Sequence, residues 1–279
     1  MLGFVPDIAF DEWVAERYEI LWPELFDPAV VDPAVDLLTE LAGAGPALEL
    51  GIGTGRIALP LHARGIEVRG IELSAAMAAR LEGQPGGSEI EVSIGDFSST
   101  VVPGAFELVY LVRNTITNLT TQQEQVAAFR NAAAHLSPGG SFVIENYIPE
   151  LQRLPPGETR HVFVATPTHI GFEEYGVVSQ IAVSHHYWVL NGELRTFSSP
   201  HRYVWPAELD LMAELAGLSL RDRWAGWSRE PFTGESRSHV SVWQSRDAIH
   251  RTAAAVSYRW HAGPAPLAGS GSQRWLAPR

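Results

Sequence analysis

The chain has 279 residues, of which 46% are hydrophobic and none is cysteine, and its 32 acidic and 20 basic residues give a formal net charge of −12. This length allows one large or two small domains, and the absence of cysteine excludes disulfides, thiolate nucleophiles and cysteine-bound zinc. The acidic balance of charge disfavours a nucleic-acid partner. No apolar run approaches the roughly 20 residues of a membrane helix, and no signal peptide is recognised. We therefore expect a cytoplasmic protein with no nucleic-acid or membrane partner.

Two helices are expected before the first strand. Asp11 can cap a helix whose apolar residues recur at helical spacing from Trp13 to Leu21. A second helix is expected to begin at Asp32-Pro33, where a capping side chain precedes a proline at the first helical position, and to run to Leu41.

Strands and helices then alternate along the chain. Strands are expected at residues 47–50, 66–73, 90–94, 106–112 and 142–147, and helices at residues 55–64, after Ser74 and at residues 121–135. The last of these helices opens with Thr121 and Glu124 at capping-box spacing and is ended by the turn residues 137–140. Such alternation predicts an α/β protein with a parallel, doubly wound sheet.

The pattern changes after Pro149. Residues 159–190 are rich in β-forming side chains, and Asn191-Gly192 between two such runs predicts a hairpin with a type I′ turn. A helix is expected at residues 206–216, followed by a last antiparallel pair of strands at residues 218–224 and 238–243. An antiparallel β insertion therefore follows the fifth strand.

The chain is expected to divide into five segments. They are a helical cap (residues 1–45), the core (46–148), the β insertion (149–205), the last helix and closing strand pair of the core (206–245) and a disordered tail (246–279). The tail is rich in alanine, glycine, proline and serine, a composition typical of disorder.

A glycine-rich loop follows the first expected strand. Gly51, Gly53 and Gly55 occupy alternate positions after the apolar run 47–50 and before a helix. A strand, a tight turn and a helix N-terminus together form a cofactor cradle in open parallel sheets. The spacing is G-x-G-x-G, and Arg56 stands where a dinucleotide-binding loop has its third glycine, which argues against NAD.

Acidic residues follow the next two strands. Glu72 ends the second strand, where a carboxylate accepts hydrogen bonds from ribose hydroxyls; this suits NAD and S-adenosylmethionine equally. Asp96 and Phe97 directly follow the third strand, where the carboxylate can accept from an adenine amino group and the ring can cover the base. The alternative is that both acids are solvated strand ends.

These motifs resemble those of the class I S-adenosylmethionine-dependent methyltransferases, over roughly residues 11–244. The matching segments are 49–56, 70–74 with Met77, 95–97 and 137–140. The resemblance implies a Rossmann-like, doubly wound, seven-stranded sheet with an antiparallel last strand, and S-adenosylmethionine as the cofactor. No metal is expected, because no tight spacing of metal ligands is present.

The resemblance also implies roles for individual residues. The implied cofactor-binding residues are Tyr18, Glu49, Gly51, Gly53, Gly55, Arg56, Glu72, Leu73, Met77, Asp96, Phe97 and Arg113. Glu49 would orient the loop and reach the methionine amino group, and Glu72 would hold the ribose. Tyr18 and Arg113 would lie at the methionine end and Met77 near adenine; core packing of Tyr18 and Met77 and a surface ion pair of Arg113 remain the alternatives.

Methyl transfer is an in-line displacement, so the protein must align the two reactants, exclude water and remove a proton from the acceptor. The candidate catalytic residues are Asn114, Glu145, Tyr147 and His186, which stand near strand ends or in the insertion. His185 precedes His186 in an expected strand, so the two rings face opposite sides and at most one faces any pocket.

The insertion is rich in histidine and aromatic residues and could form an aromatic-walled pocket. The layout resembles the methyltransferases that dimethylate amino groups of nucleotide-linked deoxysugars, which implies a small-molecule acceptor, methylated on nitrogen or oxygen, of secondary metabolism. A homodimer is left open. The alternatives are non-methylating chemistry with the same cofactor (a cyclisation or rearrangement), a non-catalytic partner subunit, and an NAD-linked dehydrogenase.

Overall fold

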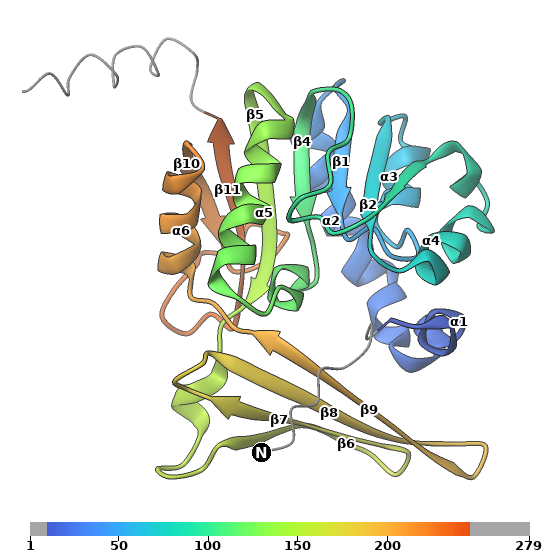
Figure 1. Ribbon diagram of the computed structural model, residues 1–279, viewed down its shortest axis with the longest axis vertical. Helices are drawn as coiled ribbons and strands as arrows, with labels where there is room; N and C mark the ends of the chain where they lie inside the picture. The colour runs from blue at the N-terminus through green and yellow to red at the C-terminus, as the bar shows by residue number, and fades with distance from the viewer. Residues whose placement is uncertain (1–9, 246–279) are drawn as a thin grey trace, which may run out of the picture. The chain divides into compact units, whose positions relative to one another are not determined.

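The central sheet of the protein has seven strands in the order β10-β11-β5-β4-β1-β2-β3 (Figure 1). A computed structural model describes residues 10–245, which belong to one compact unit. The strands are β1 (Ala47–Leu50), β2 (Val68–Glu72), β3 (Glu91–Ile94), β4 (Phe106–Leu111), β5 (Leu136–Tyr147), β10 (Leu218–Trp224) and β11 (Ser238–Ser245). β1 to β5 pair in parallel, whereas β11 runs antiparallel to both β5 and β10. This confirms the α/β sheet with its antiparallel end.

Helices cover both faces of this sheet, and one more helix, α1 (Glu12–Leu21), lies at its edge (Figure 1). The helices on the faces are α2 (Pro28–Ala42), α3 (Ala58–Ala63), α4 (Ala75–Glu82), α5 (Gln122–His135) and α6 (Pro206–Leu215). Short 3-10 turns lie at Pro23–Phe26, Gly87–Glu89, Thr115–Asn118 and Glu150–Arg153. The apolar residues of α5 and α6 belong to one core cluster, and those of α2 and α3 belong to the cluster on the other face.

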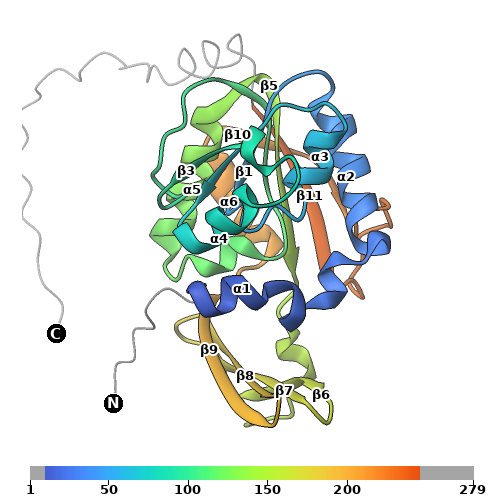
Figure 2. The same cartoon turned by 90° about the vertical axis from the view of Figure 1, so that its right-hand side faces the viewer.

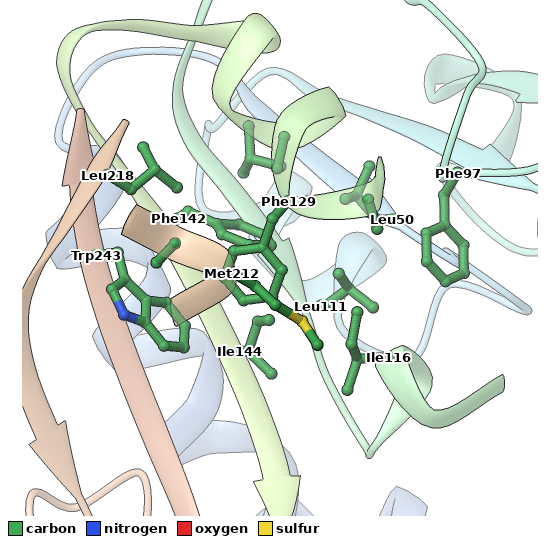
Figure 3. Packing of buried hydrophobic residues seen from close by; sticks show 14 of the residues in the cluster. Leu50, Phe97, Leu111, Ile116, Phe129, Phe142, Ile144, Met212, Leu218 and Trp243 are labelled. Carbon is green, nitrogen blue, oxygen red and sulfur yellow. The ribbon is translucent and has the colours of Figure 1, made fainter. Parts of the chain in front are cut away.

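Aromatic rings form the centre of the α5–α6 cluster (Figure 3). Phe129 of α5 meets Phe142 of β5 and Trp243 of β11 edge to face, with ring centroids 5.1 and 5.4 Å apart. All three side chains are fully buried. Offset or edge-to-face packing of this kind stabilises a core beyond the area that it buries, so the last strand is firmly tied to the parallel sheet.

Side-chain caps start three helices, α1, α4 and α5, where the sequence predicts them. The Asp11 carboxylate accepts from the N–H of Val14, and the Ser74 hydroxyl accepts from the N–H of Met77. Thr121 and Glu124 form the reciprocal capping box at the start of α5. Capping satisfies backbone donors that have no partner within the helix.

The two largest differences from the expected boundaries are at the start of α2 and at the start of β5. Helix α2 begins at Pro28, after Asp27 caps the N–H of Ala29, so the later Pro33 lies inside the helix. The sequence holds two Asp-Pro pairs, at residues 27–28 and 32–33, and each offers a cap and a proline at the first helical position. The helix starts at the upstream pair. Strand β5 begins at Leu136 instead of residue 142, since Leu136 already pairs with Phe106 before a register shift.

The insertion forms a separate antiparallel sheet of four strands. They are β6 (Arg160–Ala165), β7 (His169–Gly176), β8 (Ile181–Leu190) and β9 (Glu193–Arg202), paired in chain order. Asn191 and Gly192 have φ of 52° and 82°, which confirms the predicted hairpin turn. This sheet and α1 lie at the edge of the central sheet where the parallel strands end (Figures 1 and 2).

Within residues 10–245, no helix combines the length and the apolar content needed to cross a bilayer. The expected tail, residues 246–279, lies outside the described residues, as do residues 1–9. The division of the remaining chain into cap, core, insertion and closing segment stays a prediction.

Candidate active site

A cavity of about 400 Å³ lies at the carboxyl ends of β1, β2 and β3, and we call it the loop cavity. Open α/β sheets bind ligands at this edge. Eight of the twelve predicted cofactor-binding residues line it: Tyr18, Gly51, Gly53, Glu72, Leu73, Met77, Asp96 and Phe97. The volume falls within the range of small-molecule and cofactor sites.

The glycine loop forms one wall of the loop cavity with its backbone. Gly51 and Gly53 have φ of 75° and 58°, a conformation that favours glycine. A Cβ at Gly51 would lie 2.6 Å from Thr115 Cγ2, whereas a Cβ at Gly53 would meet only Met77, 3.5 Å away. The loop is thus shaped for close approach of its backbone to a ligand, which fits the cofactor that the resemblance implies.

Glu72 ties this loop to the end of β2. Its Oε2 accepts from the N–H of Gly53 at 2.8 Å, and its Oε1 accepts from the N–H of Ser74 at 2.9 Å. Burial raises the pKa of Glu72, while these backbone N–H groups act to lower it. Each carboxylate oxygen has a second lone pair, so the side chain could hold the loop and two ribose hydroxyls together.

Asp96, Phe97 and Met77 lie on the adenine side that the resemblance implies. The Asp96 carboxylate accepts from the N–H of Ser98 at 2.7 Å, which fixes its orientation beside the cavity. Phe97 and Met77 are buried and also line the cavity. Core packing and contact with a ligand are therefore compatible for Met77.

Four predicted cofactor residues do not line the loop cavity. Glu49 is buried and accepts from Tyr110 Oη at 2.9 Å, and burial raises its pKa to about 8. Arg56 donates to the carbonyl of Leu25. The space for a Cβ at Gly55 is occupied by leucine side chains of α3 and α4, so this glycine is required for packing. Their contacts with a cofactor, like that of Arg113, stay predictions.

A second cavity of about 570 Å³ lies against the four-stranded sheet, and we call it the sheet cavity. It is lined by α1 and the turn after it, by the ends of β4 and β5, and by β6 to β9. The two cavities share the wall residues Phe10, Tyr18, Thr115, Asn118 and Ser199. They therefore lie side by side.

The turn after β4 borders both cavities and is strained. Arg113 and Asn114 both have positive φ, 54° and 61°, which is costly for residues other than glycine. Glu145 Oε2 accepts from the N–H of Arg113 at 2.7 Å, and Asn114 Oδ1 accepts from the N–H of Tyr147 at 2.8 Å. Glu145 lines neither cavity. The structure thus gives Glu145 and Asn114 contacts that hold this turn.

Histidine and aromatic rings form one end of the sheet cavity. His186 Nδ1 lies 2.9 Å from His169 Nε2, and the His186 ring stacks on Trp188 with centroids 4.8 Å apart. Burial and the neighbouring histidines lower the pKa of His186 to about 4. As expected, His186 faces the cavity, whereas His185 is bonded to Ser198 and faces away from it.

Polar groups form the other end of the sheet cavity. The Glu173 carboxylate accepts from Tyr175 Oη and from Ser184 Oγ, the latter at 3.2 Å. Tyr147 Oη and His201 Nδ1 are buried and have no hydrogen-bond partner within residues 10–245. Burial raises the pKa of Tyr147 and lowers that of His201 to about 4. Both side chains line the cavity, so two polar atoms are left for a ligand.

Several residues of the sheet cavity were not among the predicted site residues, including Trp22, Glu24 and Glu173. His169 and His201 belong to the histidine-rich insertion that was expected to form an aromatic-walled pocket. For the residues on strands the signal was the period of two: His169 and Glu173 share a face of β7, as do Ser184 and His186 on β8. Among the described residues, no group of three or more candidate metal ligands comes together.

Comparison with known proteins agrees with this geometry. Residues 47–140 match the family model described as a methyltransferase domain. A cypemycin N-terminal methyltransferase from Streptomyces sp. is 26% identical over 245 residues, 84% of this chain and 96% of that protein. The CcbJ methyltransferase from Streptomyces caelestis is 36% identical with a TM-score of 0.70, covering 77% of this chain and 88% of that one.

A more distant structure extends the likeness of the fold. The S-adenosylmethionine-bound amino pentose methyltransferase CalS10 from Micromonospora echinaspora is 22% identical. Its TM-score is 0.62, and the alignment covers 81% of this chain and 95% of that one. At this identity the likeness concerns the fold alone.

Proposed function

The chain belongs to the S-adenosylmethionine-dependent methyltransferases, and on this premise we propose that it methylates an amine nitrogen of a small molecule in natural-product biosynthesis. The observation that carries the proposal is the shared wall between the loop cavity and the sheet cavity. Cofactor and acceptor would meet at Tyr18, Thr115, Asn118 and Ser199. Because the same residues border both cavities, ligands in the two cavities would lie next to each other, and direct displacement requires this proximity.

Residues of the loop cavity would hold the cofactor, which supplies an electrophilic methyl group on a sulfonium. Glu72 would accept from the ribose hydroxyls, and Asp96 with Phe97 would bind the adenine. Tyr18, whose ring packs against Trp22 with centroids 5.1 Å apart, would cover the methionine end. The same aromatic contact would keep water from the wall between the two cavities.

The side chains of the sheet cavity favour nitrogen over oxygen as the acceptor. A hydroxyl must lose its proton during attack and needs a base, whereas a neutral amine attacks with its own lone pair. His186 and His201 have pKa values of about 4 and are therefore weak bases. After transfer, the proton of the methylated ammonium can leave to water.

The charge of the sheet cavity also suits an amine. Glu24 and Glu173 line it, together with the rings of Trp22 and Phe163. Carboxylates and aromatic faces both attract a cationic amine and would raise its local concentration; the nitrogen to be methylated would then give its proton to water before it attacks. The relative with 26% identity is named an N-terminal methyltransferase, which supports an amino group as the acceptor.

Mass spectrometry with matched acceptors tests the proposal. The protein is incubated with S-adenosylmethionine and with amine and hydroxyl compounds of similar shape, such as benzylamine with benzyl alcohol and an amino sugar with its hydroxy counterpart. We expect a gain of one methylene unit on amines alone. Methylation of the alcohols would transfer the proposal to oxygen, and turnover without a gain in mass would indicate non-methylating chemistry.

A further inference from the structure

We propose that the acceptor carries a second amine, which stays protonated and is bound by Glu173, apart from the nitrogen that is methylated. The inference rests on the proposed function, because it concerns the molecule in the sheet cavity. It defines the acceptor as a small molecule with two amines or with another cation at the second position.

The carboxylate of Glu173 has neutral partners only. Tyr175 Oη and Ser184 Oγ donate to it, and no ion pair involves it among residues 10–245. His161 lies directly opposite Glu173 on β6, but its Nε2 pairs with Glu150 at 3.0 Å. A carboxylate in a cavity without a cationic partner favours a ligand that brings one.

Two unpartnered polar atoms lie in the same cavity. Tyr147 Oη and His201 Nδ1 are buried without a hydrogen-bond partner. Glu173 is close enough to Tyr147 for its charge to contribute to the raised pKa of that phenol. An ammonium has three N–H donors, so it could bond to Glu173 and also donate to the oxygen of Tyr147.

The position of Glu173 separates it from the reacting centre. Ser199, Ser184 and Glu173 lie opposite one another on β9, β8 and β7. Ser199 walls both cavities, whereas Glu173 lines the sheet cavity alone. Since neighbouring strands are about 4.8 Å apart, the backbones of Ser199 and Glu173 are roughly 10 Å apart.

Pairing with a carboxylate also makes an amine a poor nucleophile. A nearby negative charge favours the protonated amine, which has no lone pair for attack. The amine at Glu173 would therefore position the acceptor, while a different nitrogen, near Ser199, receives the methyl group. This division explains why a site for amine methylation would hold a carboxylate away from the methyl donor.

Calorimetry with two probes tests the inference on the protein saturated with S-adenosylhomocysteine. The probes are 4-(aminomethyl)benzylamine, which has two amines, and 4-ethylbenzylamine, which has nearly the same shape and one amine. We expect the wild type to bind the diamine about tenfold more tightly or better, because a charge-assisted hydrogen bond is gained. Glu173→Gln should remove this preference.

Glu174→Gln is the matched control. Glu174 is the next residue along β7, lies on the opposite face and pairs with exposed Arg160. This variant should keep the preference of the wild type, and thermal unfolding of all three proteins checks that they are folded. The preference of the wild type for the diamine is measured without any variant, and its absence overturns the inference. A preference for the diamine that survives in Glu173→Gln overturns it as well.

The proposed function is judged separately, by methylation of 4-ethylbenzylamine. If both probes are methylated with equal kcat/KM and bind equally, the second-amine site is wrong while N-methylation stands. If the diamine binds preferentially and neither probe gains a methyl group, the cation site stands while the proposed reaction is wrong for these amines.

Discussion

The loop cavity and the sheet cavity are built from different parts of the chain. Backbone of the glycine loop and carboxylates at strand ends form the loop cavity, and burial raises the pKa of Glu72. Side chains of an antiparallel sheet form the sheet cavity, and burial lowers the pKa values of His186 and His201 to about 4. The first is thus defined by conformation and the second by side-chain chemistry.

This difference separates what a family shares from what an individual member recognises. A backbone cradle requires glycines at fixed positions, so it leaves a motif in the sequence. A sheet face requires only that alternate residues have suitable chemistry, so many sequences can build it. The following predictions test whether the two cavities depend on these different features.

Gly53→Val is expected to have the largest effect. Valine at a φ of 58° is strained, and its side chain would extend into the loop cavity beside Met77. We expect the affinity for S-adenosylhomocysteine, measured by calorimetry, to fall at least about a thousandfold, or roughly 4 kcal/mol.

Gly65→Val is the control for backbone strain. Gly65 has a φ of 87° and open space around its Cβ position, outside both cavities. This variant should lose stability and keep its affinity for S-adenosylhomocysteine. Equal affinities in Gly53→Val and the wild type would mean that the glycine loop is not the cofactor cradle.

Stability in acid should depend on His201. Its pKa of about 4 in the folded protein lies below the ordinary value of 6.5, so its contribution is fully present above about pH 6.5 and is lost as the pH falls toward 4. Between about pH 7 and about pH 4.5, we expect the wild type to lose roughly 2 kcal/mol more unfolding free energy than His201→Gln.

Urea unfolding at the two pH values measures this difference. His185→Gln, on the opposite face of β8 and bonded to Ser198, controls for loss of a histidine from the same sheet. Equal losses in the wild type and in His201→Gln would contradict the burial of a neutral imidazole in the sheet cavity.

The sequence predicted the parts of the molecule that depend on local patterns. The succession of strands and helices along the chain follows from periodicity. The cap at Thr121 and the turn at Asn191-Gly192 follow from residues that favour these conformations. The start of α2 was wrong, since two Asp-Pro pairs offered the same local signal and the helix begins at the first of them. Boundaries are thus less predictable than elements.

The same distinction holds for the site. Six of the eight predicted residues that line the loop cavity lie in the glycine loop or at the ends of β2 and β3, where motif spacing locates them. The other two, Tyr18 and Met77, lie on α1 and α4 and were implied by the resemblance. Glu173 and His201 lie on different strands of the insertion and line the same cavity only because β7, β8 and β9 pair in a particular register. That register is a tertiary feature. Glu145 was expected to be catalytic, and this role stays a prediction; its bond to the N–H of Arg113 depends on the alignment of β4 with β5.

Glu72→Ala should weaken cofactor binding by an intermediate amount. The variant removes the acceptor for the N–H groups of Gly53 and Ser74 and the group that we expect to bind the ribose. We expect affinity for S-adenosylhomocysteine to fall about thirtyfold, or roughly 2 kcal/mol. Glu67→Ala, which loses only an exposed pair with Arg69, should bind as the wild type does; the same affinity in both variants would leave Glu72 without a role in the cradle.

Asn114→Ala should have the smallest effect, because it acts on the turn between the two cavities. Alanine at a φ of 61° keeps the strain and loses the acceptor for the N–H of Tyr147. We expect kcat for methylation of 4-ethylbenzylamine to fall about fivefold, or roughly 1 kcal/mol, while affinity for S-adenosylhomocysteine is unchanged.

Asn191→Ala introduces the same left-handed alanine at a hairpin tip that lines neither cavity. It should reduce stability and leave kcat unchanged, so the two variants separate strain in general from strain at this turn. If kcat falls equally in both, the effect is one of stability. If kcat falls in Asn114→Ala alone, the turn after β4 aligns the acceptor with the cofactor. Asn114 lines the sheet cavity and holds Tyr147, so its loss would disturb the acceptor while cofactor binding stays intact.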